Sequence, residues 1–575
     1  MNGNTKPSSG WLQKAYKNLI KTAGMPEYLF DIRIPVFFRE ESRKLMESSL
    51  RRVGWTFVMV LFCGGVSHAA MPNNTGGKGK EYEPGELIVK YRSGGEGRRR
   101  GEFHRRHGSH KMKEFPSYTM ERVKVRAGTL VDEAIREFES DPEVEYAEPN
   151  YRVHALGVPG DPSFTQLWGM KKINAPAAWD TTTGSAEVVV AVLDSGIDVN
   201  HSDLKENLWV NTLELNGRPG VDDDGNGIVD DIHGYNAITG GSDLTDDVGH
   251  GTHVAGTIGA VGNNGLGVAG VNWNVRIMAC KFLAAAGGGT AAEAIDCLHY
   301  VAQMKRRGVN IVATNNSWGG GGPSRALYDA IAAQQDVLFV VAAGNDGTNS
   351  DATPTYPASY DLPNVVAVAA TTSTDSMATF SQYGRRTVHV AAPGSAIYST
   401  SPGNSYATHS GTSMAAPHVT GLAALIKAAR PAADWRGIKN LLLAGRTLLP
   451  SLARKTVTGR QIDAFGSLTC LDSRLFSALR FPASVTPGIS AILSVLSIDC
   501  DAPLGPVTVA LSSGELYELK DDGISPDLVT GDGIFTATFT PTRSNETFYF
   551  SSPAGSEQVV TSAPPAPVPF TAAAL

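Results

Sequence analysis

The segment from Val188 to Asp194 reads Val-Val-Val-Ala-Val-Leu-Asp, and it decides the fold. Its six apolar residues do not alternate with polar ones, which is typical of a β-strand that is buried on both faces. Strands of this kind occur in parallel sheets that helices cover on both sides. A carboxylate follows the run directly, at the end of the strand where such sheets place their functional sites. The segment therefore predicts an α/β domain with a site near Asp194.

Similar runs recur through the largest block of the chain, residues 155–468. The further apolar runs that we expect to form strands are residues 275–279, 311–315, 337–342, 365–369 and 387–390. Helical patterns at residues 291–305 and 326–334 separate some of them. This alternation predicts a parallel sheet with helices on both faces.

Two smaller units flank this block. Residues 71–154 combine strand patterns at 85–91, 118–125 and 144–150 with a helical pattern at 129–139, which predicts a ferredoxin-like α+β unit. The Arg-rich stretch 98–107 fits either a helix or a solvated loop. In residues 469–562, short alternating runs such as 507–511 and 535–539 predict a small β-sandwich. The Pro/Ala-rich tail 563–575 is expected to be disordered.

Residues 46–70 have the pattern of a secretory signal peptide. Arg51 and Arg52 precede the apolar run 53–66, and small residues follow it. The run is short for a membrane anchor, which is the alternative interpretation. Signal peptides begin close to the start of a chain, so we expect translation to start at Met46 and residues 1–45 to be a misassigned upstream segment. The signal predicts an extracellular protein without stable membrane insertion after cleavage.

Export makes disulfides feasible for the four cysteines that follow the signal. Four cysteines allow three pairings, and proximity in sequence favours Cys280 with Cys297 and Cys470 with Cys500. Buried free thiols are the alternative for the first pair.

The net charge bears on one class of function. The 575 residues carry a mild net charge of −7, which gives no support for nucleic-acid binding, because that function normally shows a concentrated basic surface.

Three short segments carry the residues of a hydrolytic site. Asp194 ends the opening run, His250 lies in Gly-His-Gly-Thr-His-Val-Ala-Gly-Thr, and Ser413 lies in Gly-Thr-Ser-Met-Ala-Ala-Pro-His-Val. An acid can orient a histidine base, and that base can activate a serine hydroxyl. Taken alone, Ser413 would fit an ordinary helix N-cap, and His253 is expected to be structural. The chain order Asp, His, Ser distinguishes this arrangement from the other common triads.

These segments resemble the motifs of subtilisin-type serine peptidases, the subtilase family. The resemblance covers somewhat more than half of the chain. It implies that Ser413 is the nucleophile, His250 the general base and Asp194 its orienting acid. It also implies that Asn345, in Ala-Ala-Gly-Asn-Asp-Gly, donates its side-chain amide to the oxyanion. A turn asparagine before glycine would be the ordinary alternative.

The same resemblance indicates where substrate binds. Ser317, Trp318 and Gly319 resemble an edge segment that pairs with an extended peptide, and Gly344 and Thr355 lie around the main specificity pocket. No acidic cluster marks this pocket for basic side chains. We expect broad specificity, with a preference for bulky apolar or aromatic residues.

The resemblance gives residues 71–154 the role of an inhibitory propeptide, an intramolecular partner removed by self-cleavage between residues 151 and 161. The substrates would be proteins or peptides, and the mature enzyme is expected to be a monomer. Two other functions stay open: a narrow-specificity processing protease of the kexin type, and a binding or adhesion protein that uses an inactive protease as scaffold.

The segment from Asp222 to Asp231 indicates a metal site. Its oxygen-bearing side chains alternate as in the first half of an EF-hand loop, although His233 stands where that loop has its bidentate glutamate. A cluster of Asp/Asn/Gly turns is the alternative. Because five aspartates in ten residues repel one another, we expect a structural Ca²⁺. The expected ligands are Asp222, Asp224, Asn226 and Asp230.

Overall fold

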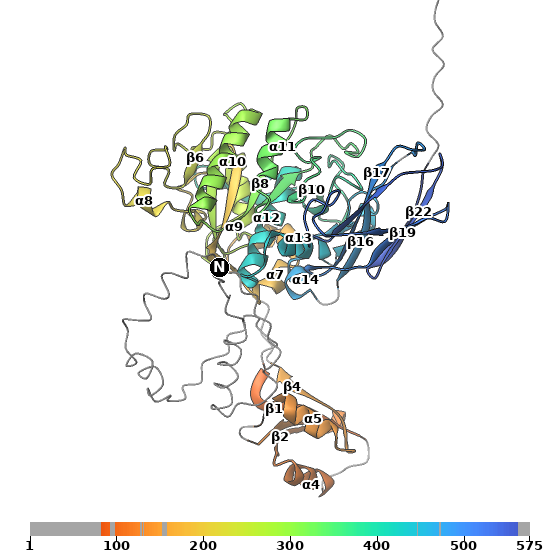
Figure 1. The fold of residues 1–575 in the computed structure, drawn as a ribbon. Helices are drawn as coiled ribbons and strands as arrows, with labels where there is room; N and C mark the ends of the chain where they lie inside the picture. Colours follow the sequence, from red (N-terminus) through yellow and green to blue (C-terminus); the bar gives the residue numbers. More distant parts are fainter. Residues whose placement is uncertain are drawn as a thin grey trace, which may run out of the picture. The chain divides into compact units, whose positions relative to one another are not determined.

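The computed structural model describes residues 82–92, 98–126, 129, 131–151, 158–445, 447–470, 473–482 and 484–561 (Figure 1). All of them belong to the compact unit Gly76–Leu575. The predicted upstream segment, signal peptide and C-terminal tail lie outside the described residues. Among the described residues, no helix combines the length and apolar character needed to cross a membrane.

A nine-stranded sheet forms the centre of the largest domain. Its order is β14-β15-β11-β10-β9-β8-β5-β7-β6. All neighbours in it pair in parallel except β14, which is antiparallel to β15. The strands are β5 (Gly184–Asp194), β6 (Gly234–Asn236), β7 (Asn274–Lys281), β8 (Ile311–Asn316), β9 (Leu338–Ala342), β10 (Val365–Thr371), β11 (Val390–Pro393), β14 (Thr447–Leu448) and β15 (Arg460–Gln461).

Helices cover both faces of this sheet. Side chains of β5 alternate between two cores: Val190 and Val192 belong to the one that holds α9 (His250–Gly259), α12 (Thr412–Ala429) and α13 (Trp435–Ala444). Val189, Ala191 and Leu193 pack on the opposite side with α10 (Ala291–Arg306) and α11 (Arg325–Ala332), which lie together in Figure 1. The predicted α/β fold with a parallel sheet between two helical layers is confirmed.

Shorter elements complete this domain. They are η3 (Phe164–Gln166), α6 (Trp168–Lys172), α7 (Ala175–Trp179), η4 (Lys205–Asn207), α8 (Thr212–Leu215), the hairpin of β12 (Ile397–Ser401) and β13 (Ser405–His409), η5 (Pro450–Leu452) and α14 (Ala464–Thr469).

The strand predicted at residues 387–390 was misplaced. The observed strand β11 begins only at Val390. Thr387 is held in the preceding loop, because its backbone N–H and its hydroxyl both donate to Asp351 Oδ1, at 3.1 and 2.9 Å. The Asp351 carboxylate, and not the backbone of a neighbouring strand, therefore accepts the hydrogen bond of the Thr387 N–H.

The N-terminal unit has a sheet of its own with the order β2-β3-β1-β4, in which all pairs are antiparallel. Its elements are β1 (Tyr82–Tyr91), α4 (Arg98–Arg106), β2 (His110–Phe115), η2 (Pro116–Tyr118), β3 (Met120–Lys124), α5 (Val131–Glu139) and β4 (Val144–Tyr151). The order and the βαββαβ succession are ferredoxin-like. The Arg-rich stretch forms helix α4, and β2 had not been predicted. Phe103 of α4 and Phe138 of α5 are buried in its core.

The C-terminal unit is a β-sandwich of two antiparallel four-stranded sheets. The first contains β16 (Arg474–Arg480), β17 (Ala491–Asp499), β18 (Ala502–Pro503) and β21 (Ile534–Phe539). The second has the order β20 (Leu516–Leu519), β19 (Val507–Leu511), β22 (Thr547–Ser552) and β23 (Gly555–Val560). Val509, Phe539 and Phe548 are buried in the core they share. The predicted sandwich is confirmed.

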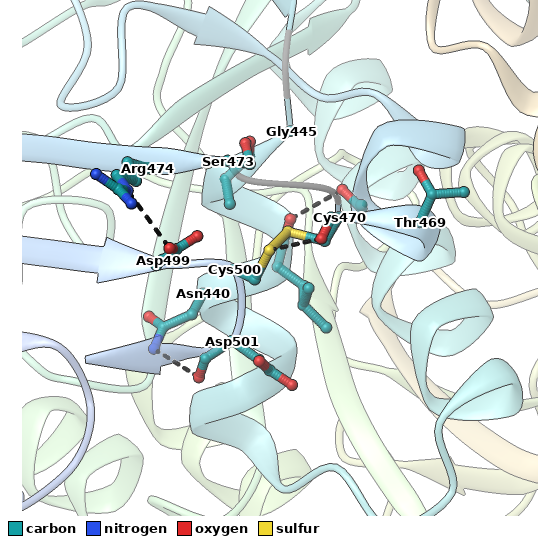
Figure 2. The surroundings of a disulfide bond; sticks show 12 residues. Asn440, Gly445, Thr469, Cys470, Ser473, Arg474, Asp499, Cys500 and Asp501 are labelled. Atoms are coloured by element: carbon teal, nitrogen blue, oxygen red, sulfur yellow. Dashed lines mark hydrogen bonds and ion pairs between the residues drawn. A yellow bond between two sulfur atoms is a disulfide. The ribbon is translucent and has the colours of Figure 1, made fainter. Parts of the chain in front are cut away.

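Both disulfides that proximity favours are present. Cys280 of β7 bonds to Cys297 of α10, so these cysteines are not free thiols. Cys470, directly after α14, bonds to Cys500, directly after β17, and so ties the large domain to the sandwich (Figure 2). Near this bond, Asn440 of α13 donates to the backbone oxygen of Asp501 at 3.4 Å.

Candidate active site

Asp194 and His250 are joined by a direct hydrogen bond. Asp194 is the last residue of β5 and is fully buried, and His250 is the first residue of α9. His250 Nδ1 lies 2.7 Å from Asp194 Oδ1, which also accepts the backbone N–H of Ser195 at 2.8 Å. A Cβ at Gly251 would lie 2.1 Å from the Gly196 oxygen. Only glycine therefore lets α9 start this close to the end of β5.

Asp246 holds the two segments in this arrangement. Its Oδ1 accepts the Ser195 hydroxyl at 2.7 Å and the Gly249 N–H at 2.8 Å. Its Oδ2 accepts the backbone N–H of Thr252 at 2.8 Å and the Thr252 hydroxyl at 2.6 Å. One buried carboxylate thus binds the first turn of α9 and the loop after β5 together. In the sequence, the only indication of this role of Asp246 is its position four residues before His250.

The pKa of His250 is raised above its ordinary value. Burial alone would lower this pKa, because it disfavours the charged ring. The negative charge of Asp194 and its hydrogen bond, with a smaller contribution from Asp246, outweigh burial. The pair is therefore suited to stabilise an imidazolium.

Ser413 is the second residue of α12, where backbone N–H groups at the helix start are free of helical partners. Its hydroxyl donates to the backbone oxygen of Ser317 at 3.0 Å, and the Ser317 hydroxyl donates to the Ser413 oxygen at 2.7 Å. The serine is thus placed by the segment that follows β8. Helices α9 and α12, which carry His250 and Ser413, pack against each other.

Asn345 lies just after β9 with its amide in a fixed orientation. Its Oδ1 accepts the backbone N–H of Thr412 at 2.8 Å and the Thr412 hydroxyl at 2.9 Å. A Cβ at Gly411 would lie 3.5 Å from Asn345 Nδ2 and 3.6 Å from the backbone nitrogen of Ser413. Asn345 Nδ2 and the backbone nitrogen of Ser413 therefore both lie near one point beside Gly411. The sequence gives no sign of Thr412, because its contact with Asn345 joins residues that are far apart in the chain.

The predicted substrate-binding residues lie on three segments of the chain. Trp318 packs edge-on against Phe282 and Phe339. The segment that contains Gly319 is bonded to the segment that contains Thr355, because the Gly320 N–H donates to the Tyr356 oxygen at 2.9 Å. The structure brings together the segments that carry Ser317, Trp318, Gly319 and Thr355, and Gly344 lies directly before Asn345.

His253 belongs to the core. It is buried, and its Nε2 lies 3.0 Å from the Ile397 oxygen and 3.2 Å from the Ala407 oxygen. Its ring stacks on His409 with centroids 4.3 Å apart. Burial, then the neighbouring His409, lower the pKa of His253 to about 3, so the ring is neutral.

The acidic loop forms a cluster that differs in part from the predicted set. Carboxylate oxygens of Glu214, Asp222 and Asp224 lie within 4.8 Å of one another. Asn226 is adjacent, since its Nδ2 lies 3.3 Å from Asp224 Oδ2. The Asp230 carboxylate is not part of this cluster and accepts the Gly220 N–H at 2.8 Å, while the Asp230 backbone N–H donates to Glu214 Oε2 at 2.9 Å. Glu214 was missed because it comes from α8, eight residues before the loop.

Known proteins resemble both the large domain and the N-terminal unit. Residues 185–460 match the Subtilase family, and residues 68–150 match the Fervidolysin N-terminal prodomain. Subtilisin-like protease 1 of Plasmodium berghei is 37% identical over 335 residues, 55% of this chain and 55% of that protein. The match thus spans about half the length of this relative. Extracellular protease of Xanthomonas campestris pv. campestris is 36% identical over 54% of this chain and 57% of that protein.

Another relative is covered more completely. Thermophilic serine proteinase of Bacillus sp. (strain AK1) is 37% identical over 313 residues, which are 53% of this chain and 70% of that protein. With the family match to the large domain and the prodomain match before it, this similarity identifies the chain as a prodomain-bearing member of the subtilase family of serine endopeptidases.

Proposed function

We propose that the chain is a secreted serine endopeptidase that hydrolyses peptide bonds with Asp194, His250 and Ser413. The observation that carries this proposal is the 2.7 Å hydrogen bond between Asp194 and His250 at the end of β5. The secreted wild type should hydrolyse an unstructured protein substrate, and Ser413→Ala should not. Equal hydrolysis by both proteins would contradict the proposal.

The proposed reaction begins when neutral His250 takes the proton of the Ser413 hydroxyl. Ser413 Oγ then leaves its contact with the Ser317 oxygen and attacks the carbonyl carbon of the scissile bond. The oxyanion that forms accepts hydrogen bonds from Asn345 Nδ2 and the Ser413 N–H. The imidazolium, stabilised by Asp194, gives its proton to the leaving amine. Water then hydrolyses the acyl-enzyme, with His250 again as the base.

Thr412→Val should lower kcat about 10-fold and leave KM nearly unchanged. The substitution keeps the backbone N–H but removes the hydroxyl that holds Asn345 Oδ1. A hydrogen bond of this kind is worth ~0.5–1.5 kcal/mol, and ~1.4 kcal/mol corresponds to a factor of ten. Steady-state kinetics on one peptide substrate check this. An unchanged kcat would mean that Thr412 does not position the oxyanion donor.

The N-terminal unit would act as an intramolecular inhibitor. It matches a prodomain, and such a unit can occupy the cleft until the chain is cut between residues 151 and 161. Secretion fits the signal pattern of residues 46–70 and a relative named extracellular protease. Substrate pairing through main-chain hydrogen bonds would allow broad specificity at most substrate positions.

The acidic cluster supports a structural Ca²⁺ site formed by Glu214, Asp222 and Asp224. The residues fit a hard cation, because all three offer carboxylate oxygens that converge. Two cationic groups are near in the described residues: the Arg307 guanidinium lies 3.5 Å from Asp224 Oδ1, and Arg218 Nε lies 3.6 Å from Oδ1 of the neighbouring Asp223. A bound ion would offset the mutual repulsion of these carboxylates and hold the loop in place.

Calcium should raise the thermal midpoint in a way that depends on Glu214. At ~100-fold excess over Kd, a single ion adds ~2.7 kcal/mol of stability. Calorimetry of the Ser413→Ala protein, which cannot digest itself, would compare Ca²⁺ with a chelator. Glu214→Gln should abolish the difference. Asp230→Asn is the matched control and should keep the difference, because the Asp230 carboxylate lies outside the cluster and the substitution keeps the backbone N–H that donates to Glu214 Oε2. Equal midpoints with and without Ca²⁺ in the parent protein would contradict the site.

A further inference from the structure

Gln382 connects the segments around the predicted specificity pocket. Its side chain is 1% exposed. Its backbone N–H donates to the Gly344 oxygen at 2.9 Å. Its Nε2 donates to the hydroxyls of Thr348 and Thr355, at 2.9 and 2.8 Å. Gln382 thus joins the residue before Asn345, through its backbone, to the segment that contains Thr355, through its side chain.

The Gln382 carboxamide occupies the place where residue 344 would carry a side chain. A Cβ at Gly344 would lie 1.5 Å from Gln382 Oε1 and 2.6 Å from its Cδ. Gly344 also has φ +114°, which side-chain-bearing residues rarely adopt. Glycine here therefore lets the carboxamide press against the backbone beside the catalytic asparagine.

Gln382 Oε1 is buried and has no hydrogen-bond partner in the part of the chain that the structure describes. Most buried polar atoms in folded proteins are paired, so an unpaired one calls for an explanation. A smaller or apolar residue would fill this position without leaving an acceptor unpaired. The carboxamide is nevertheless fixed there by two donated hydrogen bonds and cannot swing aside without breaking them.

We propose that Gln382 closes the inner end of the pocket for the P1 residue, the residue on the amino side of the scissile bond. This inference rests on the proposed peptidase function and on the place of Gly344 and Thr355 at that pocket. Two donated hydrogen bonds hold the Gln382 carboxamide in this position. The pocket therefore admits small and medium P1 side chains and excludes aromatic rings. This limit on size differs from the bulky preference expected from the sequence, and peptides that vary at P1 distinguish the two. Specificity stays broad at the other substrate positions.

The test compares peptides that differ only at P1, with Ala, Leu or Phe. Wild type should have a higher kcat/KM for Ala and Leu than for Phe. Gln382→Ala should raise the ratio of kcat/KM for the Phe peptide to kcat/KM for the Ala peptide by about 10-fold or more. One methylene of pocket space changes the discrimination between two substrates by ~10–200-fold. Gln382→Asn, whose side chain is one methylene shorter, should also raise this ratio, but by a smaller factor than Gln382→Ala. The ratio is measured within one enzyme, so it does not depend on the amount of folded protein.

Gln334→Ala is the matched control, because Gln334 also has a buried Oε1 without a partner in the described residues, but its Nε2 donates to the Leu298 oxygen of α10. Its ratio should equal that of wild type. An unchanged ratio in both Gln382 variants, or a wild type that already prefers Phe, would overturn the inference and leave the peptidase function standing. A wild type that cleaves none of the peptides would overturn the peptidase function and this inference with it.

Discussion

Ser413→Ala should leave the precursor uncleaved, with residues 71–154 still attached to the large domain. In the proposed mechanism, self-cleavage needs the Ser413 hydroxyl, and no other described serine combines the Ser317 contact with a place beside Asn345 Nδ2. In subtilisin, a member of the same family, loss of the nucleophile lowers kcat by on the order of 10⁶. Intact-mass measurement of the purified proteins would show one mature species for wild type and the full precursor for the variant.

Ser376→Ala serves as the control for this experiment. Ser376 is an exposed serine in the loop after β10, so its variant should mature like wild type. The Ser413→Ala protein should keep the wild-type far-UV spectrum, because alanine is tolerated in the first turn of a helix. Maturation of Ser413→Ala at the wild-type junction, in a host without a related protease, would contradict self-processing.

Asp194→Asn should lower kcat by roughly 10⁴, the size of loss seen when the acid of such a triad is changed. The asparagine oxygen can take the place of Asp194 Oδ1, which contacts both the Ser195 N–H and His250 Nδ1, so the loop after β5 should keep its shape. The neutral amide lacks the negative charge that stabilises the imidazolium of His250. The fold should persist, and steady-state kinetics at a saturating substrate concentration measure the loss. A decrease of less than about 10-fold would show that Asp194 is not the orienting acid.

The same substitution should shift the acidic limb of the pH profile. Catalysis needs neutral His250, so activity falls as pH drops through its pKa. In wild type this pKa is raised, and the limb lies above the ordinary histidine value. Removing the Asp194 charge leaves burial as the main effect, which lowers the pKa. The limb of kcat/KM between about pH 5 and pH 9 should therefore move to lower pH in Asp194→Asn. A limb that stays in place would contradict the assignment.

The sequence predicts the buried strand β5, strand β19 and the two disulfide pairs, because patterns between residues close in the chain determine these features. The unbroken apolar run before Asp194 predicted a strand buried on both faces, and β5 does divide its side chains between two cores. Alternating residues 507–511 coincide with β19. The disulfide partners lie close in sequence, so proximity was enough to favour the observed pairs.

What the sequence did not predict depends on contacts between distant residues. Glu214 reaches the acidic loop from α8, and Thr412 acts through Asn345, 67 residues earlier. Gln382 meets Gly344 only because two loops fold against each other. The strand expected at 387–390 failed for a similar reason, since Asp351 binds Thr387 across the fold. No periodicity or short motif encodes such pairings.

The most direct measurement of the central claim is the site of covalent labelling by a serine-directed phosphonylating reagent. Wild type should gain one phosphonyl adduct, and peptide mapping should place it on Ser413. Asp194→Asn and His250→Ala should react far more slowly, because the Ser413 hydroxyl then lacks its base or the orientation of that base. An adduct on another residue, or equal labelling rates in all three proteins, would contradict an Asp194–His250–Ser413 triad.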